Sequence, residues 1–184
     1  LAHAVSYGQS TDERFIGVLS VVAHEVFHAA FGAYKDSSPA WRQYYASNTS
    51  AFDAMLDLAQ NEGIAYYLSL IQRTRGRLSP EWEQRVRGSF EQFNRNAEEL
   101  LAPGLTHRRA QEILQRANTA GYWESYGSMA GMVIARQIDQ TFGRQALSST
   151  IASGPLAFFR KYLEVMQRDG SVPPLSPALQ RAVR

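Results

Sequence analysis

The segment that most constrains this chain is an apolar run from Thr11 to Phe31, which carries the sequence His-Glu-Val-Phe-His in its second half. Ser10 is followed three residues later by Glu13, a capping-box pattern that predicts the start of a helix. Apolar side chains then fall on nearly every face of this helix, and the run ends at Gly32. A helix that is apolar all round is expected in the centre of a fold, covered on every side.

Helical signals continue through the rest of the chain, and no segment alternates between apolar and polar residues long enough to predict a sheet. The best candidate for a short strand is 2–7, and the proline-containing tail at about 170–184 is expected to be irregular and on the surface. The sequence therefore predicts one mainly α domain over 1–184, with little or no β-sheet. Further helices are expected at about 50–72, 80–100, 106–118, 122–142, 144–151 and 155–167.

Composition narrows the function classes. The 184 residues are 45% hydrophobic and 20% charged, which is typical of a globular domain. The formal net charge is only +2 and no block of like charges exceeds three residues, so a nucleic-acid partner is not expected. Polar residues interrupt the most apolar stretches before they reach 18 residues, so no membrane span is expected. The chain has no cysteine, so a metal site would need histidine and carboxylate ligands.

The His-Glu-x-x-His sequence comprises His24, Glu25 and His28. Residues four apart stack on one helix face about 6 Å from each other, so both imidazoles can reach a single metal ion. Glu25 lies about 100° round the helix from His24, where it can accept a proton from a metal-activated water without binding the metal. Two histidines and a glutamate on an apolar helix are costly to bury unless something pairs them. This pattern favours a zinc hydrolase over a buried histidine pair.

A catalytic zinc ion takes three protein ligands and keeps one position open. Glu62 interrupts an apolar face of the next long helix and is the candidate third ligand. Gly63 beside it lets another backbone or a substrate approach closely. The alternative for Glu62 is a glutamate that faces solvent.

These residues carry a resemblance. His24-Glu25-x-x-His28-x-x-Phe31-Gly32, followed by Asn61-Glu62-Gly63-x-Ala65-x-Tyr67-Leu68, resembles the metal core of the gluzincin metallopeptidases, and most closely the aminopeptidase-N-like family. The resemblance implies a helical zincin-like core, Zn²⁺ held by His24, His28 and Glu62, and Glu25 as the general base. It also implies a peptide or protein substrate. A looser similarity to small α-helical bacterial zinc-dependent peptidases adds Tyr126-Gly127-x-Met129-Ala130 and Phe158-Phe159-x-x-Tyr162.

The sequence also departs from the aminopeptidase pattern. The 33 residues between His28 and Glu62 exceed the spacing of that family, and its G-x-M-E-N motif is absent. Only 23 residues precede His24, too few for the substrate-binding sheet that lies upstream in that family. Either that sheet was removed with an N-terminal part, or the chain is a minimal helical variant. The aminopeptidase specificity is therefore not carried over.

Two supporting roles complete the expected site. A hydrolase must stabilise the oxyanion, and gluzincins use a tyrosine or histidine from a later helix. Tyr126 is the first choice and Tyr122 the second. The small residues that follow them predict close packing against another helix, and the metal helix is one candidate. The alternative is that both tyrosines are packing residues. Asp57 and Asn61, on the helix of Glu62, are the candidates to orient a metal-binding imidazole.

The sequence thus predicts zinc-dependent hydrolysis of peptide bonds. Two alternatives stay open: a non-catalytic or degenerate zinc-binding helical domain with a structural or interaction role, and a helical interaction module that binds no metal.

Overall fold

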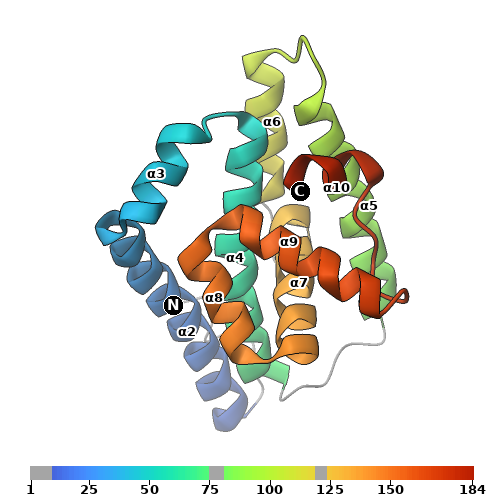
Figure 1. The fold of residues 1–184 in the computed structure, drawn as a ribbon. Coiled ribbons are helices and arrows are strands. Elements are labelled where there is room, and N and C mark those ends of the chain that lie inside the picture. The colour runs from blue at the N-terminus through green and yellow to red at the C-terminus, as the bar shows by residue number, and fades with distance from the viewer. Residues whose placement is uncertain (1–9, 75–80, 119–123) are drawn as a thin grey trace.

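The computed structural model describes residues 10–74, 81–118 and 124–184 (Figure 1). Every regular element within these ranges is an α-helix, which confirms the mainly α prediction for this part of the chain. The strand considered at 2–7 lies outside the described residues. The helices are α2 (Thr11–Ser37), α3 (Pro39–Ser47), α4 (Ala51–Thr74), α5 (Trp82–Leu101), α6 (His107–Ala117), α7 (Tyr126–Phe142), α8 (Arg144–Ser153), α9 (Pro155–Arg168) and α10 (Pro177–Val183).

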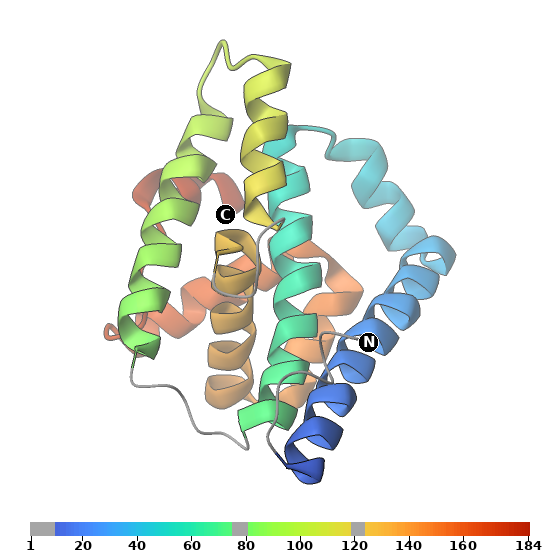
Figure 2. The ribbon, with the colours of Figure 1, turned by 180° about the vertical axis from the view of Figure 1, so that it is seen from behind.

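Helices α4 and α7 run side by side through the middle of the bundle, with α2 on one side and α5 on the other (Figures 1 and 2). They touch at two glycines. A Cβ on Gly131 would lie 1.8 Å from the carbonyl oxygen of Ala59, and a Cβ on Gly63 would lie 2.2 Å from the carbonyl carbon of Gly131. The expected close approach at Gly63 is therefore confirmed, and the partner is the backbone of α7.

The structure corrects the prediction that the first long helix is central. Helix α2 lies at the edge of the bundle and packs mainly along one side of α4 (Figure 2). Only Ser20 and Phe31 of this helix are buried, whereas Phe15 is 66% exposed and Val26 is 61% exposed. The helix also continues through Gly32, which has no positive φ and nothing within 4 Å of its Cβ position. The apolar pattern identified the helix but not its depth in the fold.

The same helix bears on the expectation that the chain has no membrane span. Among the described residues, α2 is the one helix long and apolar enough to cross a membrane, with a mean hydropathy of 1.5 over an 18-residue window. This test rests on length and composition alone, and core helices and signal sequences also pass it. It is weak evidence for a span.

The C-terminal tail was expected to be irregular, and this prediction is wrong for its last residues. Ser176 accepts a hydrogen bond from the backbone N–H of Leu179 and begins α10, with Pro177 in its first turn. Proline is favourable there because the first turn needs no N–H donor. Leu179 and Val183, one turn apart, are fully buried where α10 packs on α5 and α9.

Candidate metal centre

His24 and His28 face each other on the side of α2 that packs on α4. Their Nε2 atoms are 2.9 Å apart, and both side chains are mostly buried, with 16% and 23% of their surface exposed. Residues four apart on a helix stack in this way, so the geometry follows from the sequence spacing.

Helix α4 holds both rings from the other side. The Nδ1 of His28 donates to the Oδ1 of Asn61 over 3.2 Å, and the backbone of Ala65 lies close enough to His24 to act on its pKa. The ring of Tyr66 packs edge-on against His24, with centroids 4.7 Å apart. These contacts turn the Nε2 atom of each histidine toward a common point, as metal-binding imidazoles require.

Glu62 completes the group. Its Oε2 lies 3.7 Å from the Nε2 of His24 and 3.4 Å from the Nε2 of His28. Tetrahedral bonds of about 2.0–2.1 Å would place neighbouring donor atoms about 3.3 Å apart. The three distances in the protein, 2.9, 3.4 and 3.7 Å, fall around that value. The residues present therefore fit a zinc ion with two nitrogen ligands and one oxygen ligand.

Burial and charge bias the protonation of this group. Burial, reinforced by the neighbouring His28, lowers the pKa of His24, which favours the neutral imidazole that a metal needs. The hydrogen bond to Glu62 raises the pKa of His28 despite partial burial. Burial alone would raise the pKa of Glu62, but the hydrogen bond and charge of His28 outweigh it, so that pKa lies below its ordinary value. The carboxylate is held in its ionised form.

Glu25 is exposed on α2 and is not one of the three converging donors. Its charge is nevertheless close enough to act on the pKa values of both His24 and His28. Glu25 therefore stays the candidate for the general base that the sequence pattern predicts.

Of the two residues expected to orient an imidazole, Asn61 and Asp57, the structure places one beside a histidine. Asn61 contacts His28, as described above. Asp57 instead pairs with Lys35 and accepts a hydrogen bond of 2.8 Å from the hydroxyl of Tyr45. Asp57 therefore ties α2 and α3 to α4, and its hydrogen bonds and ion pair with described residues go to Lys35 and Tyr45 and not to either imidazole.

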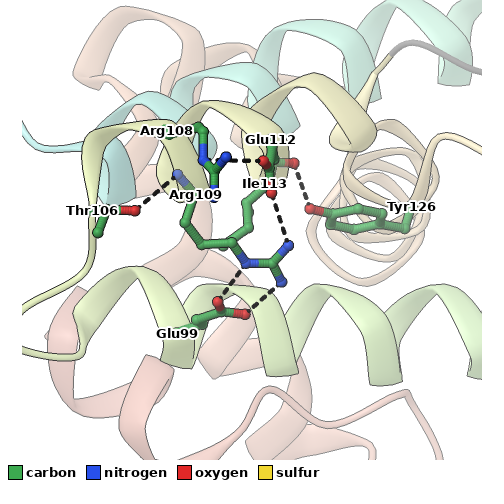
Figure 3. Close-up of polar contacts among 7 residues, drawn as sticks. All are labelled: Glu99, Thr106, Arg108, Arg109, Glu112, Ile113 and Tyr126. Carbon is green, nitrogen blue, oxygen red and sulfur yellow. Dashed lines mark hydrogen bonds and ion pairs between the residues drawn. The ribbon is translucent and has the colours of Figure 1, made fainter.

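The structure does not bring Tyr126 to the histidines. Its side chain is buried and points toward α6, where the hydroxyl donates to the carbonyl oxygen of Ile113 over 2.8 Å (Figure 3). Burial raises the pKa of Tyr126 to about 12. The small residues of α7 pack against α4 rather than against α2. The packing alternative describes Tyr126 correctly, and Tyr122 lies outside the described residues.

Sequence reasoning missed Asn118, which ends α6. Its amide lies close enough to the Glu62 carboxylate to contribute to the lowered pKa of that group. An asparagine at a helix end is common, so nothing in the sequence singled it out. Asn118, Asn61 and Glu62 also line a cavity of about 310 Å³ that extends toward Tyr44 and Tyr45. The Glu62 carboxylate thus lies on the wall of this cavity.

The fold and this group of side chains define a helical protein with a His-His-Glu site that could hold one metal ion. Residues 1–171 match the family described as "Putative zinc dependent peptidase (DUF5700)", and the chain belongs to that family. No match was found among curated proteins or among solved structures.

Proposed function

We propose that this protein is a zinc-dependent peptidase of the gluzincin type. The observation that carries the proposal is the convergence of the Nε2 atoms of His24 and His28 with the Oε2 of Glu62 at spacings that suit tetrahedral zinc. The family description independently supports zinc and a peptide substrate.

Each residue then has a chemical task. When bound, zinc activates a water molecule near neutral pH and polarises a carbonyl group. His24, His28 and Glu62 hold the ion. Asn61 and the Ala65 backbone orient the imidazole rings of His28 and His24. Glu25 accepts the proton of the attacking water and returns it to the leaving amine, so that the peptide bond breaks without a free proton in solution.

A second candidate function is a zinc-binding helical domain without catalysis. The observation that favours it is Tyr126, whose hydroxyl is committed to Ile113 and leaves the oxyanion without that expected donor. It predicts bound zinc and no turnover.

The test combines metal content with hydrolysis. After dialysis, the purified protein should retain about one zinc per chain and cleave a peptide library, and a chelator should stop the cleavage. His28→Ala should lose both properties. His107→Ala is the matched control, because His107 is an exposed histidine on α6 and should keep both. Zinc without chelator-sensitive cleavage would favour the second candidate, and no bound zinc would contradict both.

A further inference from the structure

Asn118 lies beside Glu62, but it has no task in the proposed function. It is the residue at which α6 ends, and it lines the same cavity of about 310 Å³ as Glu62 of α4, close enough to help lower the pKa of that carboxylate. Because Glu62 also faces His24 and His28, its carboxylate lies between the two imidazoles and one amide. A carboxylate with donors on both sides has fewer accessible rotamers than one held from a single side.

The Asn118 amide is itself held in one orientation. The hydroxyl of Ser128, a fully buried residue of α7, donates to the Oδ1 of Asn118 over 2.6 Å. An amide whose oxygen accepts from Ser128 presents its NH₂ group on the other side, toward Glu62. Ser128 therefore fixes which side of the Asn118 amide faces the cavity that Asn118 shares with Glu62.

The backbone packing around this chain explains how three helices meet there. Gly127 has no side chain, and a Cβ at this position would lie 3.0 Å from the Cβ of Ala117. The end of α6 therefore lies directly against the start of α7, which places Asn118 beside Ser128. One turn further along α7, Gly131 touches Gly63, the neighbour of Glu62. Helix α7 thus supports Glu62 through its backbone contact with α4, and its Ser128 orients Asn118 at the end of α6.

We propose that Asn118, oriented by Ser128, is a positioning residue that fixes the Glu62 carboxylate toward His24 and His28. This inference rests on the proposed function, because it assigns Asn118 to the geometry of the same zinc site. Residues that orient metal ligands typically change metal affinity by about 10–100-fold when they are removed.

The test measures the zinc dissociation constant by competition with a chromophoric chelator. Asn118→Ala should weaken zinc binding by about 10–100-fold, and Ser128→Ala should weaken it by a smaller factor because the amide can then rotate. Asn118→Asp keeps the shape of the side chain but replaces the donor with a second carboxylate, so its binding should be at least as weak as that of Asn118→Ala. A residue that only fills space would be rescued by this isosteric change.

Asn94→Ala is the matched control. Asn94 also braces two segments through both ends of its amide, since it donates to the carbonyl of Pro174 and accepts from the N–H of Ser176, each over 2.9 Å. It has no contact with the metal group, so its removal should affect thermal stability and leave zinc affinity unchanged.

Three results would overturn the inference. If the unmodified protein binds zinc and both Asn118 variants match its affinity, Asn118 has no positioning role, although the proposed function stands. If Asn94→Ala weakens zinc binding as much as Asn118→Ala, the effect reports general destabilisation. If the unmodified protein binds no zinc, the proposed function fails together with this inference.

Discussion

In the proposed function, catalysis depends on Glu25, whose exposed carboxylate accepts a proton from the attacking water. Because Glu25 lies outside the three converging donors, Glu25→Gln should keep about one zinc per chain. It should lower peptide hydrolysis by about 10²–10⁴-fold, since the amide cannot accept the proton of the attacking water. Metal analysis and initial rates check the two halves of this prediction.

Glu98→Gln, at an exposed glutamate on α5, serves as the control and should retain activity. If Glu25→Gln loses zinc instead of activity alone, Glu25 is a ligand and the roles of Glu25 and Glu62 must be exchanged.

Tyr126, unlike Glu25, is expected to affect stability and not activity. Its hydroxyl donates to a backbone carbonyl in the core, so Tyr126→Phe should lower the free energy of unfolding by about 1 kcal/mol. The activity per folded molecule should stay the same, because the phenol does not point at the imidazoles. Urea denaturation and specific activity measure the two effects. A fall in kcat of about 10²–10³-fold with unchanged stability would restore the oxyanion role.

At the scale of the helices, the α4–α7 contact lies at Gly63, next to Glu62, which is a zinc ligand in the proposed function. Gly131→Ala would place a methyl group 1.8 Å from the carbonyl oxygen of Ala59, and a backbone atom in a helix cannot move aside cheaply. We expect a loss of about 3 kcal/mol or more in the free energy of unfolding, measured by urea denaturation.

The control for this contact is Gly88→Ala. Gly88 is exposed in α5 and has nothing within 4 Å of its Cβ position. Alanine there should stabilise the protein by about 0.5–1 kcal/mol, because it restricts the unfolded chain and favours the helix. If Gly131→Ala changed the free energy of unfolding by no more than Gly88→Ala does, α4 and α7 would not be in close contact.

Helix α2 gives a second prediction at this scale, because one phenylalanine on it is exposed and another is buried. Phe31 is 3% exposed and packs against Trp41, so Phe31→Ala should cost about 3–5 kcal/mol. Phe15 is 66% exposed, so Phe15→Ala should change the free energy of unfolding by less than about 0.5 kcal/mol. An equally large cost at Phe15 would mean that this face of α2 is covered in solution.

For the whole molecule, His24 and His28 of α2 and Glu62 of α4 form one candidate metal site that joins the two helices. Zinc bound there should therefore stabilise the fold. At a free zinc concentration 100 times the dissociation constant, binding to the native state alone adds about 2.7 kcal/mol. For a chain of this length that corresponds to a rise in Tm of about 5–10 °C. Thermal unfolding with zinc, with a chelator and with zinc restored checks this expectation.

His28→Ala should remove the dependence of Tm on zinc, and magnesium should not replace zinc, because it prefers oxygen ligands in octahedral geometry. A Tm that does not respond to zinc would contradict a site shared by the two helices.

The sequence by itself determined the features that depend on neighbours along the chain. The helical period places His24 and His28 on one face, and the caps and glycines indicate most of the helices. It also indicated Glu62, because a carboxylate on an apolar helical face needs a partner. These inferences need only local geometry and the cost of burying charge.

Only the tertiary structure decided which side of each helix meets which neighbour. Apolar residues on all faces of α2 do not say which face α4 covers, so the expected central helix lies at the edge of the bundle. The direction of the Tyr126 phenol depends on α6 lying beside α7, and the contact of Asn118 with Glu62 depends on three helices meeting at Gly127 and Gly131. These contacts join residues far apart in sequence, and no local periodicity encodes them.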